Sequence, residues 1–144
     1  MQQFQGAGAA RPHRDFIAAL ADEALEAVVI CPSNPFISVD PMLAIPGLRA
    51  ALIGARAPVV AVSPIIGGRA VKGPTAKMMA ELGLEVSARA LAERYGDLLD
   101  VFVADEADAG TLDGLACRVV LASTLMRTNA DKVALARIVL DTAR

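Results

Sequence analysis

The sequence predicts an α/β domain with a mainly parallel sheet, and three observations lead to that prediction. Short, continuous apolar runs recur along the 144 residues. Segments with apolar residues at helical spacing lie between these runs. The hydrophobic share is 55%, whereas aromatic residues make up only 3%, so alanine, valine, leucine and isoleucine build the interior. Strands that alternate with helices form βαβ units, and a sheet covered on both faces needs such an apolar interior.

The four expected strands are short runs rich in valine and isoleucine. They cover residues 27–31, 58–63, 100–104 and 118–121. Continuous apolar runs of this kind are typical of strands that are buried on both faces. In open α/β sheets, ligands bind beyond the carboxyl ends of the strands, so the loops that follow these runs are the places to search for a site.

The expected helices lie before, between and after these strands. They cover residues 15–25, 46–55, 75–82, 86–95 and about 130–143. Gly83 is expected to stop the third helix. Either Thr128 or Asn129 can cap the last helix, where Asp131 favours the positive end. The sequence shows no internal repeat and no interdomain linker, so residues 1–144 are expected to form one domain, in which the first dozen residues are loose.

Charge and cysteine content exclude several classes of protein. With 14 basic and 16 acidic side chains the net charge is −2, which gives no basic field for non-specific binding of nucleic acid. Cys31 and Cys117 lie in apolar runs without a CxxC motif, and His13 is the single histidine, so no zinc site is expected. We expect two buried, reduced thiols in a cytoplasmic protein. No apolar stretch reaches about 18 residues, so no membrane span is expected.

The loop at 32–38, with the sequence PSNPFIS, follows the first expected strand. Two prolines stiffen this loop, and Ser33 and Asn34 supply compact hydrogen-bonding groups. Two interpretations are open. The residues alone favour a turn shaped by proline, in which Asn34 bonds its own backbone. In the other interpretation, Ser33 and Asn34 contact a ligand.

The loop at 65–77 follows the second expected strand and carries the strongest signal for a ligand. No acidic residue occurs between Leu52 and Glu81, whereas three cations and three glycines fall in this loop. Glycines allow the backbone to approach a ligand closely, and the first amides of the following helix attract anions. The residues predicted to bind phosphate are Gly67, Gly68, Arg69, Lys72, Gly73, Thr75 and Lys77. Neither a Walker A motif nor a GxGxxG fingerprint is present, and a solvated basic turn is the alternative.

Two aspartates after the third expected strand are candidate ligands of a magnesium ion. Asp105 and Asp108 belong to an acidic stretch, and hard cations prefer carboxylate oxygens. The residues favour the alternative, in which these aspartates cap helices or form a solvated edge. After the fourth strand, Thr124 and Thr128 are expected to cap the last helix or to touch a ligand, and Met126 to belong to the core. The chain has no GxSxG motif, and its single histidine lies in a loose segment, which argues against hydrolase chemistry.

Four ordered motifs carry a resemblance that covers nearly the whole chain from about Phe4 onward. They are VICPSNPFISVDPMLAIPGLRAAL at 29–52, VVAVSPIIGGRAVKGPTAKMMAELGLEVSARALAERY at 59–95, GDLLDVFVADEAD at 96–108 and TLMRT at 124–128. Together they resemble the C-terminal half of the 2-phospho-L-lactate transferases (CofD type). Several motifs in order are far more specific than one short pattern.

The resemblance implies a Rossmann-like α/β fold and a particular reaction. Enzymes of this family transfer a phospholactyl group from a guanosine diphosphate-linked donor to the deazaflavin Fo and release GMP, in the biosynthesis of coenzyme F-420. Some relatives use a phosphoenolpyruvyl donor, and magnesium is required. The matching motifs imply that Ser33 and Asn34 lie in the ligand cleft and that the 67–77 loop faces the substrates.

The chain also departs from the family pattern. Family members are much longer, and neither their GGTGGAK-type motif nor the aspartates expected to hold magnesium have a counterpart here. Asp40 replaces a usual glycine and Ser123 a usual aspartate, both in loops of the expected cleft. We therefore expect the C-terminal part of a larger domain: a fragment, a truncated reading frame or a split subunit. Such a chain is expected not to catalyse transfer alone, and to form a homo-oligomer or bind a complementary N-terminal half.

Two alternatives to the enzyme are open at this point. One is a non-catalytic nucleotide- or phosphate-binding module of the same fold. The other is a regulatory relative that senses a sugar nucleotide. The sequence does not distinguish the phospholactyl donor from the phosphoenolpyruvyl donor.

Overall fold

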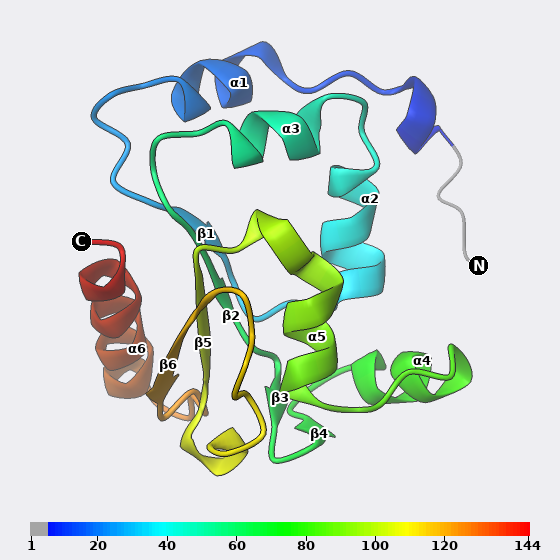
Figure 1. Ribbon diagram of the computed structural model, residues 1–144, viewed down its shortest axis with the longest axis vertical. Coiled ribbons are helices and arrows are strands. Elements are labelled where there is room, and N and C mark those ends of the chain that lie inside the picture. Colours follow the sequence, from blue (N-terminus) through cyan, green and yellow to red (C-terminus); the bar gives the residue numbers. More distant parts are fainter. Residues whose placement is uncertain (1–5) are drawn as a thin grey trace.

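The core of the structure is a four-stranded parallel sheet. The computed structural model describes residues 6–144. Within them β1 (Val28–Ile30), β2 (Val59–Val62), β5 (Val101–Asp105) and β6 (Arg118–Ala122) pair in the order β1-β2-β5-β6 (Figure 1). All four expected strands are present, with ends that differ by no more than one residue. Helices flank the sheet, so the expected α/β class with a Rossmann-like parallel sheet is confirmed.

The two central strands are buried on both faces, and the two outer strands are not. Val60, Phe102 and Val103 have no exposed surface, because β2 and β5 have neighbouring strands on both sides. Val29 in β1 and Leu121 in β6 are 39% and 44% exposed. The expectation of burial on both faces is therefore wrong for β1 and β6, because these strands lie at the edges of the sheet, where a neighbouring strand and part of the helical cover are absent.

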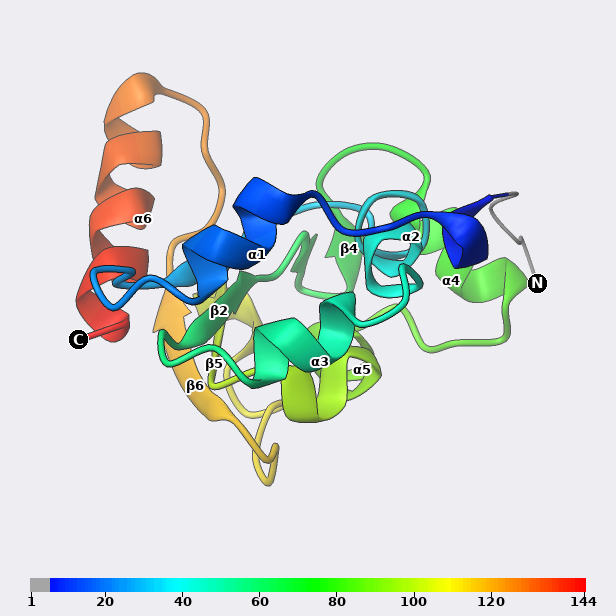
Figure 2. The same cartoon turned by 90° about the horizontal axis from the view of Figure 1, so that it is seen from above.

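Helices cover both faces of the sheet (Figure 1, Figure 2). One face carries α1 (Arg14–Leu20), α3 (Leu48–Ile53) and α5 (Ala88–Tyr95). On this face Leu91 of α5 belongs to the same buried cluster as Phe102. The other face carries α6 (Asn129–Thr142), whose Leu135 and Val139 pack with the valines of β2 and β5. Aliphatic residues thus fill both layers, as the composition predicts.

Two helices, α1 and α3, are about one turn shorter than the sequence predicts. α1 ends at Leu20, because the side chain of Asp22 accepts a hydrogen bond from the N–H of Ala24 at 2.9 Å and forms a turn. α3 begins after Gly47, whose φ of 82° is a left-handed conformation that favours glycine. Pro46 therefore lies before the helix rather than in its first turn.

Side-chain caps fix the starts of two further helices. At α5, the Ser87 hydroxyl accepts a hydrogen bond from the N–H of Ala90 at 3.1 Å. At α6, Thr128 accepts from the N–H of Asp131 at 3.2 Å, and the Asp131 carboxylate accepts from the N–H of Thr128 at 2.8 Å, which is a capping box. Thr128 is therefore the cap. Hydrogen bonds from the N–H groups of Thr128 and Arg127 lower the pKa of Asp131.

The structure contains elements that the sequence does not predict. A π-helical turn at Pro35–Val39 runs into the short α2 (Asp40–Leu43). β3 (Ile65–Ile66) pairs with β4 (Arg69–Ala70) as a separate antiparallel hairpin. Strands of this length are too short to show an alternating pattern. The hairpin leads into α4 (Thr75–Glu81), which Gly83 ends as expected, with a φ of 69°.

The start of the chain is only partly described. Residues 1–5 lie outside the described residues, so the expectation of a loose first dozen residues applies to a segment that is described only from residue 6 onward. There, Ala7–Ala9 form a single 3-10 turn. Within the described residues, no helix is both long enough and apolar enough to cross a membrane.

The two cysteines are free, and neither is buried. Cys31 is exposed and Cys117 is half-buried, so the expectation of two buried thiols is wrong. The reason is position, because Cys31 follows edge strand β1 and Cys117 precedes edge strand β6. Partial burial still raises the pKa of the Cys117 thiol.

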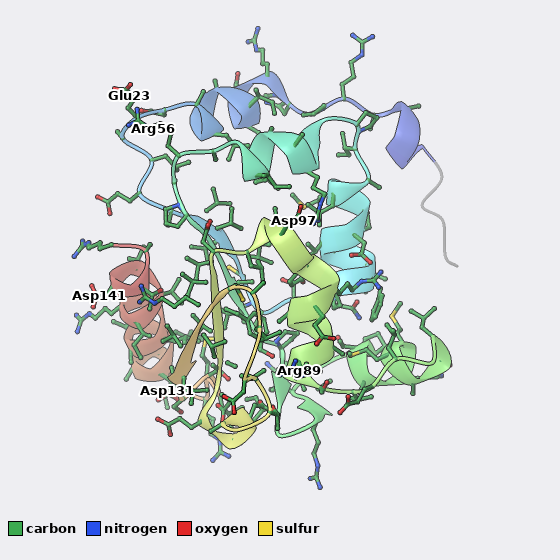
Figure 3. All side chains as sticks on the ribbon, in the orientation of Figure 1. Glu23, Arg56, Arg89, Asp97, Asp131 and Asp141 are labelled. Carbon is green, nitrogen blue, oxygen red and sulfur yellow. The ribbon has the colours of Figure 1, made fainter. Side chains whose placement is uncertain are left out.

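Surface ion pairs join segments that are distant in the sequence. Arg56 lies 3.3 Å from Glu23 and connects the segment before β2 with the segment before β1 (Figure 3). The two side chains are 82% and 85% exposed. Pairs this exposed add little to stability, so the fold depends on its aliphatic core.

Candidate functional site

A cavity of about 170 Å³ lies at the carboxyl ends of the parallel strands. Its walls come from the segments that follow β1, β2 and β6, from the β3–β4 hairpin and from the start of α4. The lining residues are Pro32, Ser33, Asn34, Ser63, Pro64, Ile66, Val71, Lys72, Thr75, Thr124 and Met126. Open α/β sheets bind ligands at this position, so the loops indicated by the sequence do converge on a cavity.

The cavity contains some of the predicted site residues and leaves out others. Ser33, Asn34, Lys72 and Thr75 line it. The residues that do not line it are Gly67, Gly68, Arg69, Gly73 and Lys77. The predicted phosphate-binding loop therefore divides into a hairpin tip that lies away from the cavity and a second part, around Lys72 and Thr75, that faces it. Ligand binding by these residues stays a prediction.

Gly67 and Gly68 form the turn of the β3–β4 hairpin. Their φ angles are 53° and 72°, and a two-residue hairpin turn with positive φ at both positions favours glycine strongly. The N–H of Gly67 donates to the Asp108 carboxylate at 3.1 Å, which fixes the hairpin against the segment after β5. The turn thus accounts for both glycines without a ligand.

The three predicted cations have different surroundings. Lys77 forms an ion pair with Glu81 at 3.7 Å, one helical turn away, and both side chains are exposed. Arg69 is exposed on β4. Lys72 lies at the cavity, where it is the basic member of the described lining residues. Lys72 is therefore the cation best placed to meet an anionic ligand.

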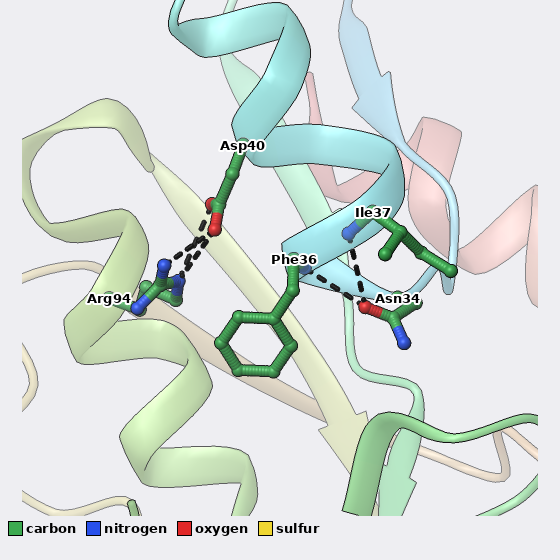
Figure 4. Close-up of polar contacts among 5 residues, drawn as sticks. All are labelled: Asn34, Phe36, Ile37, Asp40 and Arg94. Atoms are coloured by element: carbon green, nitrogen blue, oxygen red, sulfur yellow. Dashed lines mark hydrogen bonds and ion pairs between the residues drawn. The ribbon is translucent and has the colours of Figure 1, made fainter. Parts of the chain in front are cut away.

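Asn34 has a structural role through its side-chain oxygen. This oxygen accepts hydrogen bonds from the N–H groups of Phe36 at 2.9 Å and Ile37 at 3.3 Å, so it caps the π-helical turn (Figure 4). The interpretation in which Asn34 bonds its own backbone is confirmed. The amide nitrogen lies 3.5 Å from the sulfur of Met78, a weak acceptor. One amide N–H is thus weakly engaged by Met78, and the other is the donor left for a ligand in the cavity.

An ion pair holds the segment with Asn34 in place. Asp40 binds the guanidinium of Arg94 on α5, with Nη2–Oδ2 at 2.5 Å and Nε–Oδ2 at 3.1 Å (Figure 4). The same guanidinium lies 4.7 Å from the centre of the Phe36 ring. Asp40 thus supports the loop from behind and does not line the cavity, which corrects its expected place in the cleft. Ser123 does lie in a cavity loop, but its side chain is exposed and is not part of the lining.

Two nearly buried hydroxyl groups face the cavity. Ser63, at 2% exposure, follows β2 directly; its hydroxyl donates to the carbonyl oxygen of Ile65 at 2.9 Å and accepts from the N–H of Ile65 at 3.1 Å. Thr75, also at 2% exposure, opens α4. Among the described residues the Thr75 hydroxyl has no hydrogen-bond partner. No fully buried polar side-chain atom there lacks a partner, so the Thr75 hydroxyl oxygen is accessible, and it opens onto the cavity.

Asp105 orders the segment after β6. Its Oδ2 accepts hydrogen bonds from the N–H of Thr124 at 2.9 Å and from the Thr124 hydroxyl at 3.0 Å, and its Oδ1 accepts from the N–H of Ala107 at 3.0 Å. Desolvation would raise the pKa of Asp105, but these hydrogen bonds outweigh it, and the pKa lies below its usual value. Thr124, at 5% exposure, does not cap α6 and instead lines the cavity.

The two candidate magnesium ligands are both occupied as hydrogen-bond acceptors. Asp105 caps the 3-10 turn Glu106–Asp108 and binds Thr124, which is the capping role that the sequence favours. Asp108 is 4% exposed and accepts from Gly67. Residues 6–144 contain no cluster of three or more carboxylate, histidine or cysteine side chains that suits a metal ion. Asp105 and Asp108 by themselves therefore do not fit a magnesium site.

Some lining residues are absent from the sequence-based prediction. Met126, expected in the core, is 36% exposed and lines the cavity, because the segment between β6 and α6 runs along the surface. Ser63 has a signal in the sequence, since it is the last residue of the expected strand at 58–63 and so lies at its carboxyl end. Ile66 and Val71 reach the cavity through the hairpin, which the sequence does not reveal.

Comparison with known proteins decides the family. Residues 2–135 match the family model of 2-phospho-L-lactate transferase CofD. The chain belongs to this family. The loops around the cavity, at 32–38, 63–77 and 123–126, all lie within the matched region.

Individual members of the CofD family show how much of the protein is covered. The 2-phospho-L-lactate transferase of Methanosarcina mazei is 45% identical over 122 residues, which are 83% of this chain and 40% of that protein. That of Methanosarcina acetivorans is 47% identical over 118 residues, 76% of this chain and 38% of the relative. The phosphoenolpyruvate transferase of Kitasatospora aureofaciens is 42% identical over 121 residues, which are 80% of this chain and 37% of that protein. The chain thus spans 37–40% of the length of these curated relatives.

Proposed function

We propose that this chain contributes the phosphate-binding part of a transferase that moves a phospholactyl or phosphoenolpyruvyl group from a guanosine diphosphate-linked donor to the deazaflavin Fo. One observation carries the proposal: in a member of the CofD family, Lys72 and the free hydroxyl of Thr75 face one cavity at the carboxyl ends of the strands. Such a reaction belongs to the biosynthesis of coenzyme F-420.

The chemistry of the transfer suits these groups. The hydroxyl oxygen of Fo forms a bond to the phosphorus of the donor. The bond from that phosphorus to the bridging oxygen breaks, and GMP and the hydroxyl proton are released. Negative charge on the phosphate oxygens is stabilised by positioned cations and hydrogen-bond donors. Lys72 supplies the charge, and Thr75 and the Asn34 amide supply donors.

The identity of the donor stays open between two groups. Relatives of similar identity carry the names 2-phospho-L-lactate transferase and phosphoenolpyruvate transferase. The two donor groups have the same phosphate and differ beyond it, so the phosphate contacts proposed here serve either one.

Magnesium is proposed as the cofactor, bound by residues outside this chain. The hydrogen-bonded carboxylates of Asp105 and Asp108 do not form such a site. When bound, magnesium would neutralise phosphate charge. The proposal for this chain extends only to the contacts of Lys72, Thr75 and Asn34.

We further propose that the chain acts in the cytoplasm with a complementary N-terminal half, or as a homo-oligomer. The free thiols Cys31 and Cys117 suit a reducing compartment. The exposed apolar side chains of Val29 and Leu121, on the two edge strands, offer surface for a further chain.

A second candidate function is a non-catalytic nucleotide-binding module. The observation that favours it is the absence of a metal-binding cluster from residues 6–144. In this case the cavity would hold the phosphate groups of guanosine diphosphate without turnover.

A product assay separates these possibilities. Fo, magnesium and each guanosine donor are incubated with the chain alone, and with the chain plus the part of the Methanosarcina mazei relative that it does not cover. We expect no product from the chain alone and product from the combination. Binding of guanosine diphosphate without product in either mixture would favour the non-catalytic module. Absence of guanosine diphosphate binding would refute the proposed function.

A further inference from the structure

The Thr124 hydroxyl has its proton committed to a neighbouring carboxylate. It donates to Oδ2 of Asp105 at 3.0 Å, while the backbone N–H of Thr124 donates to the same oxygen at 2.9 Å. An ionised carboxylate only accepts hydrogen bonds, so the direction of the hydroxyl bond is fixed. Because Thr124 lines the cavity with this proton already used, a ligand that reaches the hydroxyl can only donate to its lone pairs.

Ser63 is committed in the same way. Its hydroxyl donates to the carbonyl oxygen of Ile65 at 2.9 Å, and a carbonyl oxygen also only accepts. Ser63 follows β2 and Thr124 follows β6, so both groups come from the strand ends. The part of the cavity wall formed by these two strand ends therefore offers hydrogen-bond acceptors and no free hydroxyl proton.

Of the other polar lining residues, Lys72 and Asn34 offer donors, whereas the hydroxyls of Ser33 and Thr75 can both donate and accept. The Lys72 ammonium group has donors only. Asn34 uses its oxygen on the N–H groups of Phe36 and Ile37, so its amide N–H groups are what it presents to a ligand. The Thr75 hydroxyl has no partner among the described residues. Among the hydroxyls that line the cavity, Ser63 and Thr124 therefore differ from Ser33 and Thr75, because their protons are already used in hydrogen bonds within the chain.

The size of the cavity indicates which parts of a ligand it holds. At about 170 Å³ it is smaller than the roughly 300–1,000 Å³ of pockets that enclose whole drug-sized ligands. It therefore holds the reacting groups rather than an entire nucleotide. In the transfer proposed above these groups are a phosphate, which accepts hydrogen bonds, and the attacking hydroxyl of Fo, which donates one.

We infer that Thr124 accepts a hydrogen bond from the attacking hydroxyl of Fo, and that Asp105 is a positioning residue that fixes the Thr124 hydroxyl for this contact. The inference rests on the proposed function, in which the group that receives the transferred phosphate is a hydroxyl. Asp105 reaches the ligand only through Thr124. The hydrogen bonds from Thr124 and Ala107 keep the Asp105 carboxylate ionised at neutral pH, so Asp105 orients the Thr124 hydroxyl rather than taking up a proton.

A coupling experiment tests the contact. Calorimetry measures binding of Fo, and of an Fo analogue in which hydrogen replaces the attacking hydroxyl, to the wild-type chain and to Thr124→Val and Thr124→Ser, with guanosine diphosphate present. We expect that removing either the Thr124 hydroxyl or the attacking hydroxyl of Fo weakens binding about tenfold. Removing both hydroxyls together should weaken binding no further. Thr124→Ser should bind Fo like the wild type. Asp105→Asn should weaken binding of Fo but not of the analogue, which a general loss of structure would not do.

The outcomes separate this inference from the proposed function. Additive losses, or equal affinity of the wild type and Thr124→Val for Fo, would overturn the inference and leave the guanosine diphosphate site intact. Binding of guanosine diphosphate without any binding of Fo would also overturn it. If the wild type bound neither guanosine diphosphate nor Fo, both the inference and the proposed function would be overturned. If circular dichroism shows that Thr124→Val does not fold, Thr124→Ser and Asp105→Asn decide, through their different affinities for Fo and its analogue.

Discussion

Asp40 and Arg94, 54 positions apart in the sequence, form an ion pair that fastens the Asn34 segment to α5. The Nη2–Oδ2 distance is 2.5 Å, and the Arg94 guanidinium also lies over the Phe36 ring. Because Phe36 is one of the residues capped by Asn34, the pair supports the same turn that brings Asn34 to the cavity. Asp40 thus helps to hold the cavity loop.

Asp40→Asn is expected to lower the free energy of unfolding by about 0.5–1 kcal/mol, because the side chains of the pair are 30% and 36% exposed. Urea denaturation measures the loss, which should shrink at about 1 M salt because salt screens the charges. The matched control is Glu23→Gln, which breaks the more exposed pair with Arg56 and should change stability very little. Equal losses in both variants would show that the Asp40 pair has no special role.

Asn34→Ala is expected to lower stability by about 1 kcal/mol, because it removes the cap of the π-helical turn. Asn34→Asp keeps the capping oxygen and removes the amide donors. It should therefore retain stability and bind guanosine diphosphate more weakly. Thermal unfolding and calorimetry measure the two effects separately. Unchanged binding in a stable Asn34→Asp variant would limit Asn34 to the turn.

Gly68→Ala is expected to lower stability by about 1–2 kcal/mol, because alanine is strained at a φ of +72°. Gly68→Asn should lose less, since asparagine tolerates this conformation better. Both variants should bind guanosine diphosphate like the wild type, because Gly68 forms the hairpin turn and does not line the cavity. Loss of binding in a folded Gly68→Asn variant would return this glycine to the ligand site.

Asp105 is expected to make stability depend on pH in the acidic range. The pKa of Asp105 is lower in the folded chain than in the unfolded chain, where it is near 3.9. The contribution of Asp105 to the free energy of unfolding is therefore complete above the unfolded pKa and is lost as the pH falls through the folded pKa. Urea denaturation between about pH 2 and pH 7 should show this loss in the wild type. Asp105→Asn should be less stable at neutral pH and lose less on acidification.

The control for this pH dependence is Asp113→Asn, which changes an exposed carboxylate of the same acidic stretch. Its stability should follow the wild-type pH curve. If Asp105→Asn followed that curve as well, the hydrogen bonds with Thr124 would contribute nothing to stability.

The sequence predicts the sheet well, because strands that become buried in the sheet consist of apolar residues. β2 and the first four residues of β5 are continuous runs of valine, alanine and phenylalanine, a pattern that is typical of strands with helices on both faces. Once the strands are parallel, their carboxyl ends lie at one edge, and this places Ser33, Lys72 and Thr75 in the search region. The family motifs then add the chemistry.

What the sequence does not predict depends on contacts between distant residues. Lys72 and Lys77 look alike in sequence, and only the fold shows that Lys77 pairs with Glu81 while Lys72 lines the cavity. The contact of Gly67 with Asp108 spans 41 positions and carries no local signal. The β3–β4 hairpin cannot be predicted from the sequence for a different reason, since its strands are only two residues long.

Calorimetric titration of guanosine diphosphate into the wild-type chain, Lys72→Ala and Lys77→Ala tests the central claim most directly. If the cavity holds the phosphate groups, Lys72→Ala weakens binding by about 1–3 kcal/mol, the scale of a lost charge-assisted hydrogen bond. Lys77→Ala removes the same charge outside the cavity and should bind like the wild type. Equal affinity of Lys72→Ala and the wild type, or an equal loss in both variants, would contradict the claim that this cavity is the phosphate site.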